Sequence, residues 1–145
     1  MSQIGDLAES LYFEQKYCCS EAVWLAFAIS DNLSEAEKNA GNKLAFAFCG
    51  GLGNGQFCGA LAGGFMVIGR YFGRVCGEER NDTTASYREA LTKAFIEKYS
   101  SIDCSSLKPT DPTKSRLQCK TYVRFVAETL ADLLDKGLEE EEDCG

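Results

Sequence analysis

The sequence predicts an all-α protein, a single-domain bundle of about six helices. Apolar residues recur every three or four positions along nearly the whole chain, and no segment alternates apolar and polar residues over a sustained length. Pro109 and Pro112 fall in one connection, so neither interrupts a helix. A chain of 145 residues with 45% hydrophobic content can also bury a core of its own. We therefore expect one helical domain over residues 1–138 and an acidic tail at residues 139–145.

The first half of the chain contains three helical patterns. Apolar stripes within residues 4–11 and 22–29 predict two helices that form an antiparallel hairpin, the second of which ends at Asp31 and Asn32. Ser34 and Glu37 have the spacing of a capping box, which predicts the start of a third helix. That helix continues into a glycine-rich loop.

Three more helices are expected in the second half. Residues 57–72 form the fourth, whose small residues at four-residue spacing allow a neighbouring helix to approach closely. Its apolar stretch is well short of the ~20 residues that a membrane span needs. A cap among residues 82–84 begins the fifth helix. The sixth carries apolar residues from 119 to 134 and ends near Gly137, a natural helix terminator.

Composition excludes several classes of function. The net charge of −7 argues against nucleic acid and anionic membranes as partners, since both require clustered Lys and Arg. No signal peptide is visible, so we expect a cytoplasmic protein. The chain has no His, which removes mixed His-Cys zinc sites and Cys-His nucleophiles. Eight cysteines are many for a reducing compartment, and we expect some of them to be metal ligands or redox centres.

A glycine-rich loop comes directly before Cys58, at the start of the fourth helix. Unpaired N–H groups and the positive end of the helix dipole favour a thiolate there, so Cys58 is expected to be the most activated cysteine. Backbone N–H groups of the loop could also face a cofactor or a thiolate, although glycines equally suit a plain helix connection. The candidate cofactor-binding residues are Gly53, Asn54, Gly55 and Gly59.

The cysteines form no Cys-x-x-Cys pair, so simple zinc-ribbon and thioredoxin patterns are absent. Four of them nevertheless occupy comparable places, at predicted helix starts or in the loops beside them. These four are Cys19, Cys58, Cys104 and Cys119. Because helix ends can converge, we expect them to meet at one site.

The order of these cysteines resembles the C_GCAxxG_C_C family of redox-active proteins. The carriers are the segment at residues 17–23, the glycine-rich segment at 50–63 and the downstream pair Cys104 and Cys119. The chain reads Cys58-Gly59-Ala60 where the family name has Gly-Cys-Ala, and either Cys18 or Cys19 could supply the first cysteine. The resemblance implies a redox or metal role without a defined reaction.

The leading hypothesis is a redox-active protein for electron transfer or redox sensing, with an unidentified redox partner protein. The four cysteines would be ligands of an iron-sulfur cluster or zinc, or they would interchange as thiols and disulfides, with Cys58, Cys104 and Cys119 reacting. Cys104 with Cys119 is the simplest disulfide pair. A thiol oxidoreductase using two cysteines remains open. The competing hypothesis is a non-catalytic helical interaction module with structural buried cysteines, and a homo-oligomer is compatible with either.

Overall fold

The all-α prediction is confirmed by the computed structural model, which describes residues 3–108 and 111–137. The elements are α1 Gln3–Phe13, α2 Cys19–Ser30, α3 Glu35–Phe46, the π-helical turn η1 Gly51–Gly55, α4 Gly59–Phe72, α5 Thr83–Tyr99, α6 Cys104–Leu107 and α7 Pro112–Lys136. The glycine-rich segment precedes α4, as expected. The one-turn helix α6 lies where a loop was predicted. The acidic tail at 139–145 lies outside the described residues, and the single-domain organisation stays a prediction.

Several helix ends follow the expected chemistry. Ser34 caps α3 by accepting a hydrogen bond from the Glu37 N–H at 3.2 Å. Asp31 ends α2, and Gly137 ends α7 with a positive φ of 75°. At α5 the N-cap is Asp82, one of the predicted positions, but its side chain makes no capping hydrogen bond. The side chain of the preceding Asn81 accepts from the Thr83 N–H at 3.1 Å instead and satisfies one of the free N–H groups.

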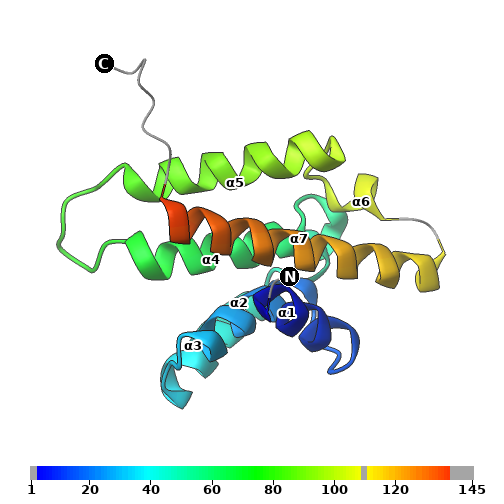
Figure 1. Ribbon diagram of the computed structural model, residues 1–145, viewed down its shortest axis with the longest axis horizontal. Coiled ribbons are helices and arrows are strands. Elements are labelled where there is room, and N and C mark those ends of the chain that lie inside the picture. Colours follow the sequence, from blue (N-terminus) through cyan, green and yellow to red (C-terminus); the bar gives the residue numbers. More distant parts are fainter. Residues whose placement is uncertain (1–2, 109–110, 138–145) are drawn as a thin grey trace.

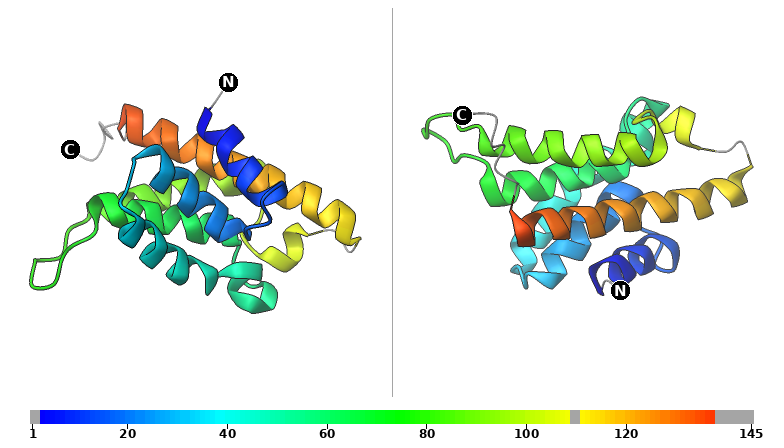
Figure 2. Two further views of the ribbon diagram at one scale, coloured as in Figure 1. Left: turned by 90° about the horizontal axis from the view of Figure 1, so that it is seen from below. Right: turned by 45° about the horizontal axis from the view of Figure 1, so that its top comes forward.

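Helix α2 forms the centre of the molecule. It packs against α1, α3, α4 and α7, and its residues from Cys19 to Ala28 are buried. Helices α4, α5 and α7 run side by side, and the first three helices pack beneath them (Figure 1). Figure 2 shows α6 and η1 together at one end of this layer, whereas the connection between α4 and α5 projects at the other. The functional candidates gather at the α6 end.

The small residues of α4 allow the close packing that the sequence predicted. A Cβ added at Gly63 would lie 2.5 Å from the Ser20 carbonyl oxygen in α2, and one at Gly64 would lie 2.9 Å from Leu91 in α5. Neither gap could hold a larger side chain without moving a neighbouring helix. The close approach brings the starts of α2 and α4 together. Among the described residues, no helix is long and apolar enough to cross a membrane.

Candidate functional site: a cavity lined by four cysteines

Four cysteines from four different helices line one small cavity. Cys19 is the first residue of α2, Cys58 is the N-cap of α4, Cys104 is the first residue of α6, and Cys119 lies two turns inside α7. All four are free thiols, exposed by 9% or less. The remaining lining residues are Gly59, Ala60, Leu107, Lys108 and Tyr122. The structure thus brings together the four cysteines that the sequence singled out, while their chemical role stays a prediction.

Two hydrogen bonds hold the helices around this cavity. The Cys58 N–H donates to the Ile102 carbonyl at 2.8 Å, which joins the start of α4 to the segment before α6. The Tyr122 hydroxyl, on α7, donates to the Leu107 carbonyl of α6, also at 2.8 Å. Each buried contact of this kind contributes about 1 kcal/mol. Together they anchor the short helix that carries Cys104.

Two glycines let the sulfur atoms approach the backbone. A Cβ added at Gly59 would stand 2.5 Å from the Sγ of Cys19, far inside van der Waals contact. Gly51, in η1, has a φ of 63° and packs directly against the Cys104 side chain. Any residue with a side chain would collide at either place. The glycines therefore position the cysteines in addition to shaping the loop.

The cavity is too small for an organic substrate. Its free space of about 10 Å³ is close to what one water molecule occupies. Its wall is almost wholly apolar apart from the sulfurs, the Tyr122 hydroxyl and the ammonium group of Lys108 at the edge. Such a site suits an inorganic ligand or reactions among the sulfurs themselves.

Burial is the largest influence on the pKa values of Cys58 and Cys19. It raises the pKa of Cys58 to about 12, although the N–H groups of Leu61 and Ala60 in the first turn of α4 act in the opposite direction. It also raises the pKa of Cys19 to about 11, and the neighbouring Cys119 and Cys104 add to this effect. The expectation that Cys58 is an activated thiolate is therefore wrong for the free thiol. The helix start lowers its pKa as predicted, but desolvation is the larger effect.

The pKa of Cys104 is also set by opposing effects. Burial raises its pKa, Lys108 lowers it, and the adjacent Asp103 raises it further, as the sequence suggested. Lys108 lowers the pKa of Cys19 as well. A cation bound among the sulfurs would act in the same direction as this lysine and far more strongly.

The predicted cofactor-binding residues have different surroundings. Gly59 lines the cavity, whereas Gly55 packs against Ser105 on α6. Gly53 and Asn54 lie within η1, and their cofactor role stays a prediction. The beginning of the glycine-rich loop contacts the cavity cysteines. There the Gly50 backbone lowers the pKa of Cys19, and Gly51 contacts Cys104.

A disulfide joins Cys18 to Cys49, with 5.7 Å between their Cα atoms. Cys104 and Cys119, the simplest disulfide pair expected from the sequence, are both free thiols in this structure, and a switchable bond between them stays a prediction. Neither Cys18 nor Cys49 has a predicted role of its own. They are 31 residues apart and form no recognisable spacing, so only the packing of α2 against the segment after α3 could reveal the pair.

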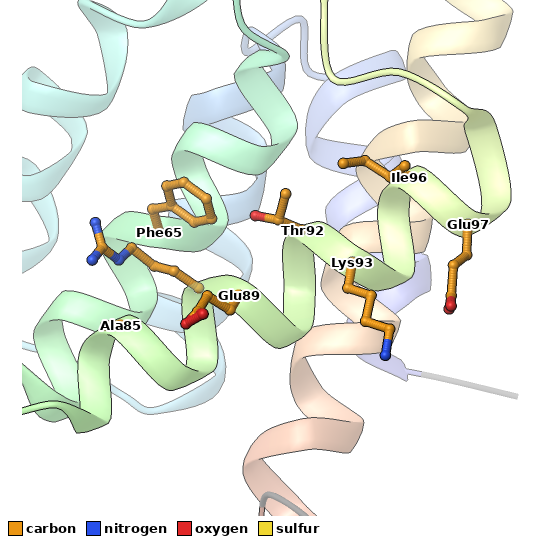
Figure 3. Close-up of a pocket in the computed structure, with 8 residues that line it drawn as sticks. Phe65, Ala85, Glu89, Thr92, Lys93, Ile96 and Glu97 are labelled. Atoms are coloured by element: carbon orange, nitrogen blue, oxygen red, sulfur yellow. The ribbon is translucent and has the colours of Figure 1, made fainter.

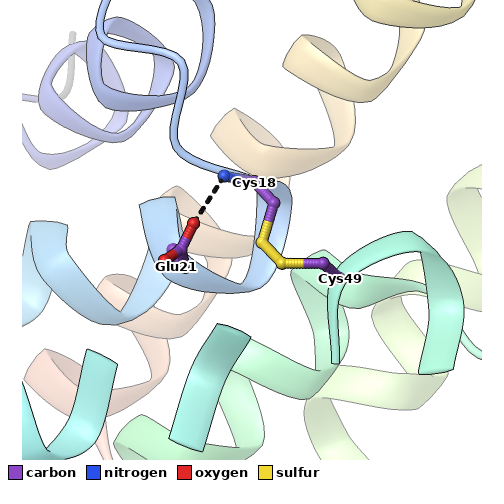
Figure 4. Close-up of side chains that lie close together, drawn as sticks. All are labelled: Cys18, Glu21 and Cys49. Atoms are coloured by element: carbon purple, nitrogen blue, oxygen red, sulfur yellow. Dashed lines mark hydrogen bonds between the residues drawn. A yellow bond between two sulfur atoms is a disulfide. The ribbon is translucent and has the colours of Figure 1, made fainter. Parts of the chain in front are cut away.

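The disulfide lies beside a buried carboxylate (Figure 4). In the part of the chain that the structure describes, Cys18, Glu21 and Cys49 are the one group of three or more metal-ligand residues whose ligand atoms all lie within 4.8 Å of one another. The four cavity thiols are consequently spread more widely. The two cysteine groups are neighbours, since Cys18 precedes Cys19.

Another groove lies away from the cysteines. Figure 3 shows it along α5, where Phe65 of α4 faces the Thr92 side of the helix. Ile96, which is 43% exposed, and the charged Arg88 and Lys93 also line it. It contains no cysteine, so it has no part in thiol chemistry.

Fold and cavity together define the class: an all-α protein in which four buried thiols line one cavity. The comparison with protein families finds the model described as "Putative redox-active protein (C_GCAxxG_C_C)", which matches residues 17–133. The chain belongs to this family. The matched segment contains all four cavity cysteines and both disulfide cysteines. Comparisons with curated proteins and with solved structures find no match.

Proposed function

We propose that this redox-active protein transfers electrons through an iron-sulfur cluster held by Cys19, Cys58, Cys104 and Cys119. The observation that carries the proposal is that four buried thiols from four helices line one cavity. Four thiolates satisfy an iron-sulfur cluster without any imidazole, and this chain has no His. When bound, the cluster supplies a centre that accepts and releases one electron at a time.

The spacing of the sulfurs favours a cluster over a single zinc ion. A tetrahedral zinc with Zn–S bonds of about 2.3 Å holds its sulfurs roughly 3.8 Å apart. No three of the four cavity thiols, all of them described residues, lie within 4.8 Å of one another. A cluster spreads its ligands over several metal atoms and so accepts wider spacing. The sulfur spacing therefore favours a cluster over a single zinc ion, and because the free space is only about 10 Å³, the four sulfurs must move outward when a cluster is built between them.

The surrounding residues have tasks that follow from their positions. The N–H groups of Ala60 and Leu61 stabilise negative charge on Cys58, and Gly50 does so for Cys19. Lys108 compensates the charge on Cys19 and Cys104. N–H donors and positive charges beside the thiolate ligands raise the reduction potential of a thiolate-bound centre. The apolar wall limits access of water.

The high pKa values argue against the thiol oxidoreductase alternative. A thiol with a pKa of about 12, as burial gives Cys58, has little thiolate with which to attack a partner disulfide at neutral pH. Deep burial also keeps the four sulfurs from a protein partner. Electron transfer requires no such contact, because an electron can pass from a buried centre to a partner protein at the surface. A reducing cytoplasm would keep these thiols available for iron.

The test is anaerobic purification followed by reconstitution with ferrous iron and sulfide. The expected result is visible charge-transfer absorption with bound iron and sulfide, lost in Cys58→Ser. The matched control is Cys76→Ser, because Cys76 is an exposed free cysteine outside the cavity. Iron binding that survives Cys58→Ser would refute the assignment. Protein that binds no iron and has four slowly reacting thiols would instead support the helical interaction module.

A further inference from the structure

The group formed by Cys18, Glu21 and Cys49 has properties that the four-cysteine cavity does not explain. A carboxylate oxygen of Glu21 lies within 4.8 Å of both sulfurs, which are bonded to each other and would separate on reduction to the roughly 3.8 Å that one zinc ion requires. Both cysteines are only partly buried, so reductants and metal ions can reach them. Glu21 itself is 9% exposed.

The Glu21 carboxylate is held in place by two different parts of the chain. Its Oε1 accepts from the Cys18 N–H at 3.0 Å, and its Oε2 accepts from the Asn42 side-chain amide at 3.1 Å. Each oxygen keeps a free lone pair for a metal ion. Hydrogen-bond donors of this kind also hold metal-binding carboxylates in the correct orientation in other proteins.

The charge of Glu21 is not compensated. Within residues 3–108 and 111–137, no Lys or Arg forms an ion pair with it. A carboxylate at this depth normally has a cationic partner or coordinates a metal. The capping box of α2 accounts for the bond to Cys18 but not for the anchoring by Asn42 on α3.

We propose that reduction of the Cys18–Cys49 disulfide creates a zinc site, in which both thiolates and the Glu21 carboxylate bind one Zn²⁺. A dithiol reductant gives two electrons to the S–S bond and becomes a disulfide itself, while the two sulfurs take up its two protons. Zinc then displaces both protons. Cysteine sulfur and carboxylate oxygen are both zinc ligands, and zinc accepts three protein ligands with water in the fourth position.

The consequence is that zinc occupancy reports the redox state of the surroundings. A disulfide oxidant takes two electrons from the two thiolates, gains two protons from water and becomes a dithiol; this restores the Cys18–Cys49 bond and removes both sulfur ligands, so the ion leaves. This site is separate from the four-cysteine cavity and does not depend on the iron-sulfur assignment. The geometry distinguishes them, because only here does a carboxylate oxygen lie within 4.8 Å of two sulfurs, among the described residues.

The test measures zinc binding by competition with a chromophoric chelator, on protein with the disulfide intact and on protein reduced anaerobically with a phosphine. The phosphine is removed before titration. Reduced protein is expected to bind one more equivalent of zinc than oxidised protein. Glu21→Gln, which retains the capping hydrogen bond, should weaken this extra site at least about tenfold. Cys76→Ser should leave it unchanged.

Several outcomes would overturn the proposal. It is wrong if reduced and oxidised protein bind the same amount of zinc, or if Cys49→Ser keeps the extra equivalent. It is also wrong in its carboxylate ligand if Glu21→Gln binds as tightly as the native chain. Repeating the titration in Cys58→Ser separates the two sites: the extra equivalent should persist there even if the cavity binds no metal.

Discussion

Replacing Gly59 by Ala tests whether the glycine of the cysteine-glycine segment is there to admit the Cys19 sulfur. The added Cβ would lie 2.5 Å from that Sγ and 3.2 Å from the Phe48 carbonyl oxygen. Ordinary contacts between such atoms are about 3.5–4.0 Å, so the sulfur must move by roughly 1 Å. The Phe48 carbonyl restricts movement of the new methyl group in the other direction. The substitution should therefore both destabilise the fold and displace a cavity cysteine.

The expected magnitude comes from overpacking, which costs about 1–3 kcal/mol. For a chain of this length, 1 kcal/mol corresponds to roughly 3 °C in melting temperature. We expect Gly59→Ala to lower the melting temperature by about 3–10 °C, measured by circular dichroism. Iron content after reconstitution, measured on the folded fraction, should fall as well.

The matched control is Gly69→Ala in the same helix. No atom lies within 4 Å of a Cβ added there, and its φ is not positive. It should stabilise the protein by about 0.5–1 kcal/mol, because Ala favours a helix over Gly. If Gly59→Ala behaves like Gly69→Ala in both stability and iron content, the positioning role of Gly59 is refuted.

Three further predictions concern the cysteines. The double variant Cys18→Ser, Cys49→Ser removes a cross-link over 31 residues of chain. It should lower the free energy of unfolding by about 4 kcal/mol and the melting temperature by roughly 12 °C. Equal melting temperatures with and without the cross-link, in buffer that contains a chelator, would contradict this. Burial raises the pKa values of Cys19 to about 11 and Cys58 to about 12, from 9.0. Reduced, metal-free protein should therefore be stabilised by these thiols below about pH 9 and lose that stability as the pH rises towards 12, since the unfolded chain releases the protons first. Denaturant titrations across this range measure it, and stability that rises with pH there would refute the cause. Near neutral pH, iodoacetamide should label the exposed Cys76 before either buried thiol.

Much of the fold could be predicted from local patterns. Helical periodicity, the Ser34 cap and the Gly137 end each depend on a few neighbouring residues, so the sequence carries them directly. The one-turn helix α6 was not predicted, because four residues are too few to show a period.

The candidate site divides in the same way. The order of the cysteines and the family resemblance singled out the four residues that line the cavity. The acidity of Cys58 was misjudged, because the helix start is visible in the sequence whereas the depth of burial is not. The disulfide was missed for a related reason: Cys18 and Cys49 meet only when α2 packs against the segment that follows α3.

The sequence by itself determined that this protein is helical, that it is rich in cysteine and that Cys19, Cys58, Cys104 and Cys119 are the four to expect around one cavity. These properties depend on residue type and short-range spacing. Only the tertiary structure decided how the cysteines are grouped. Four of them line a buried cavity, and two others form a disulfide beside Glu21. The physical reason is that the distances between sulfurs and their desolvation depend on how helices far apart in the sequence pack together. Gly59 and Gly63 allow α4 to approach α2 closely, and this approach brings Cys58 near Cys19.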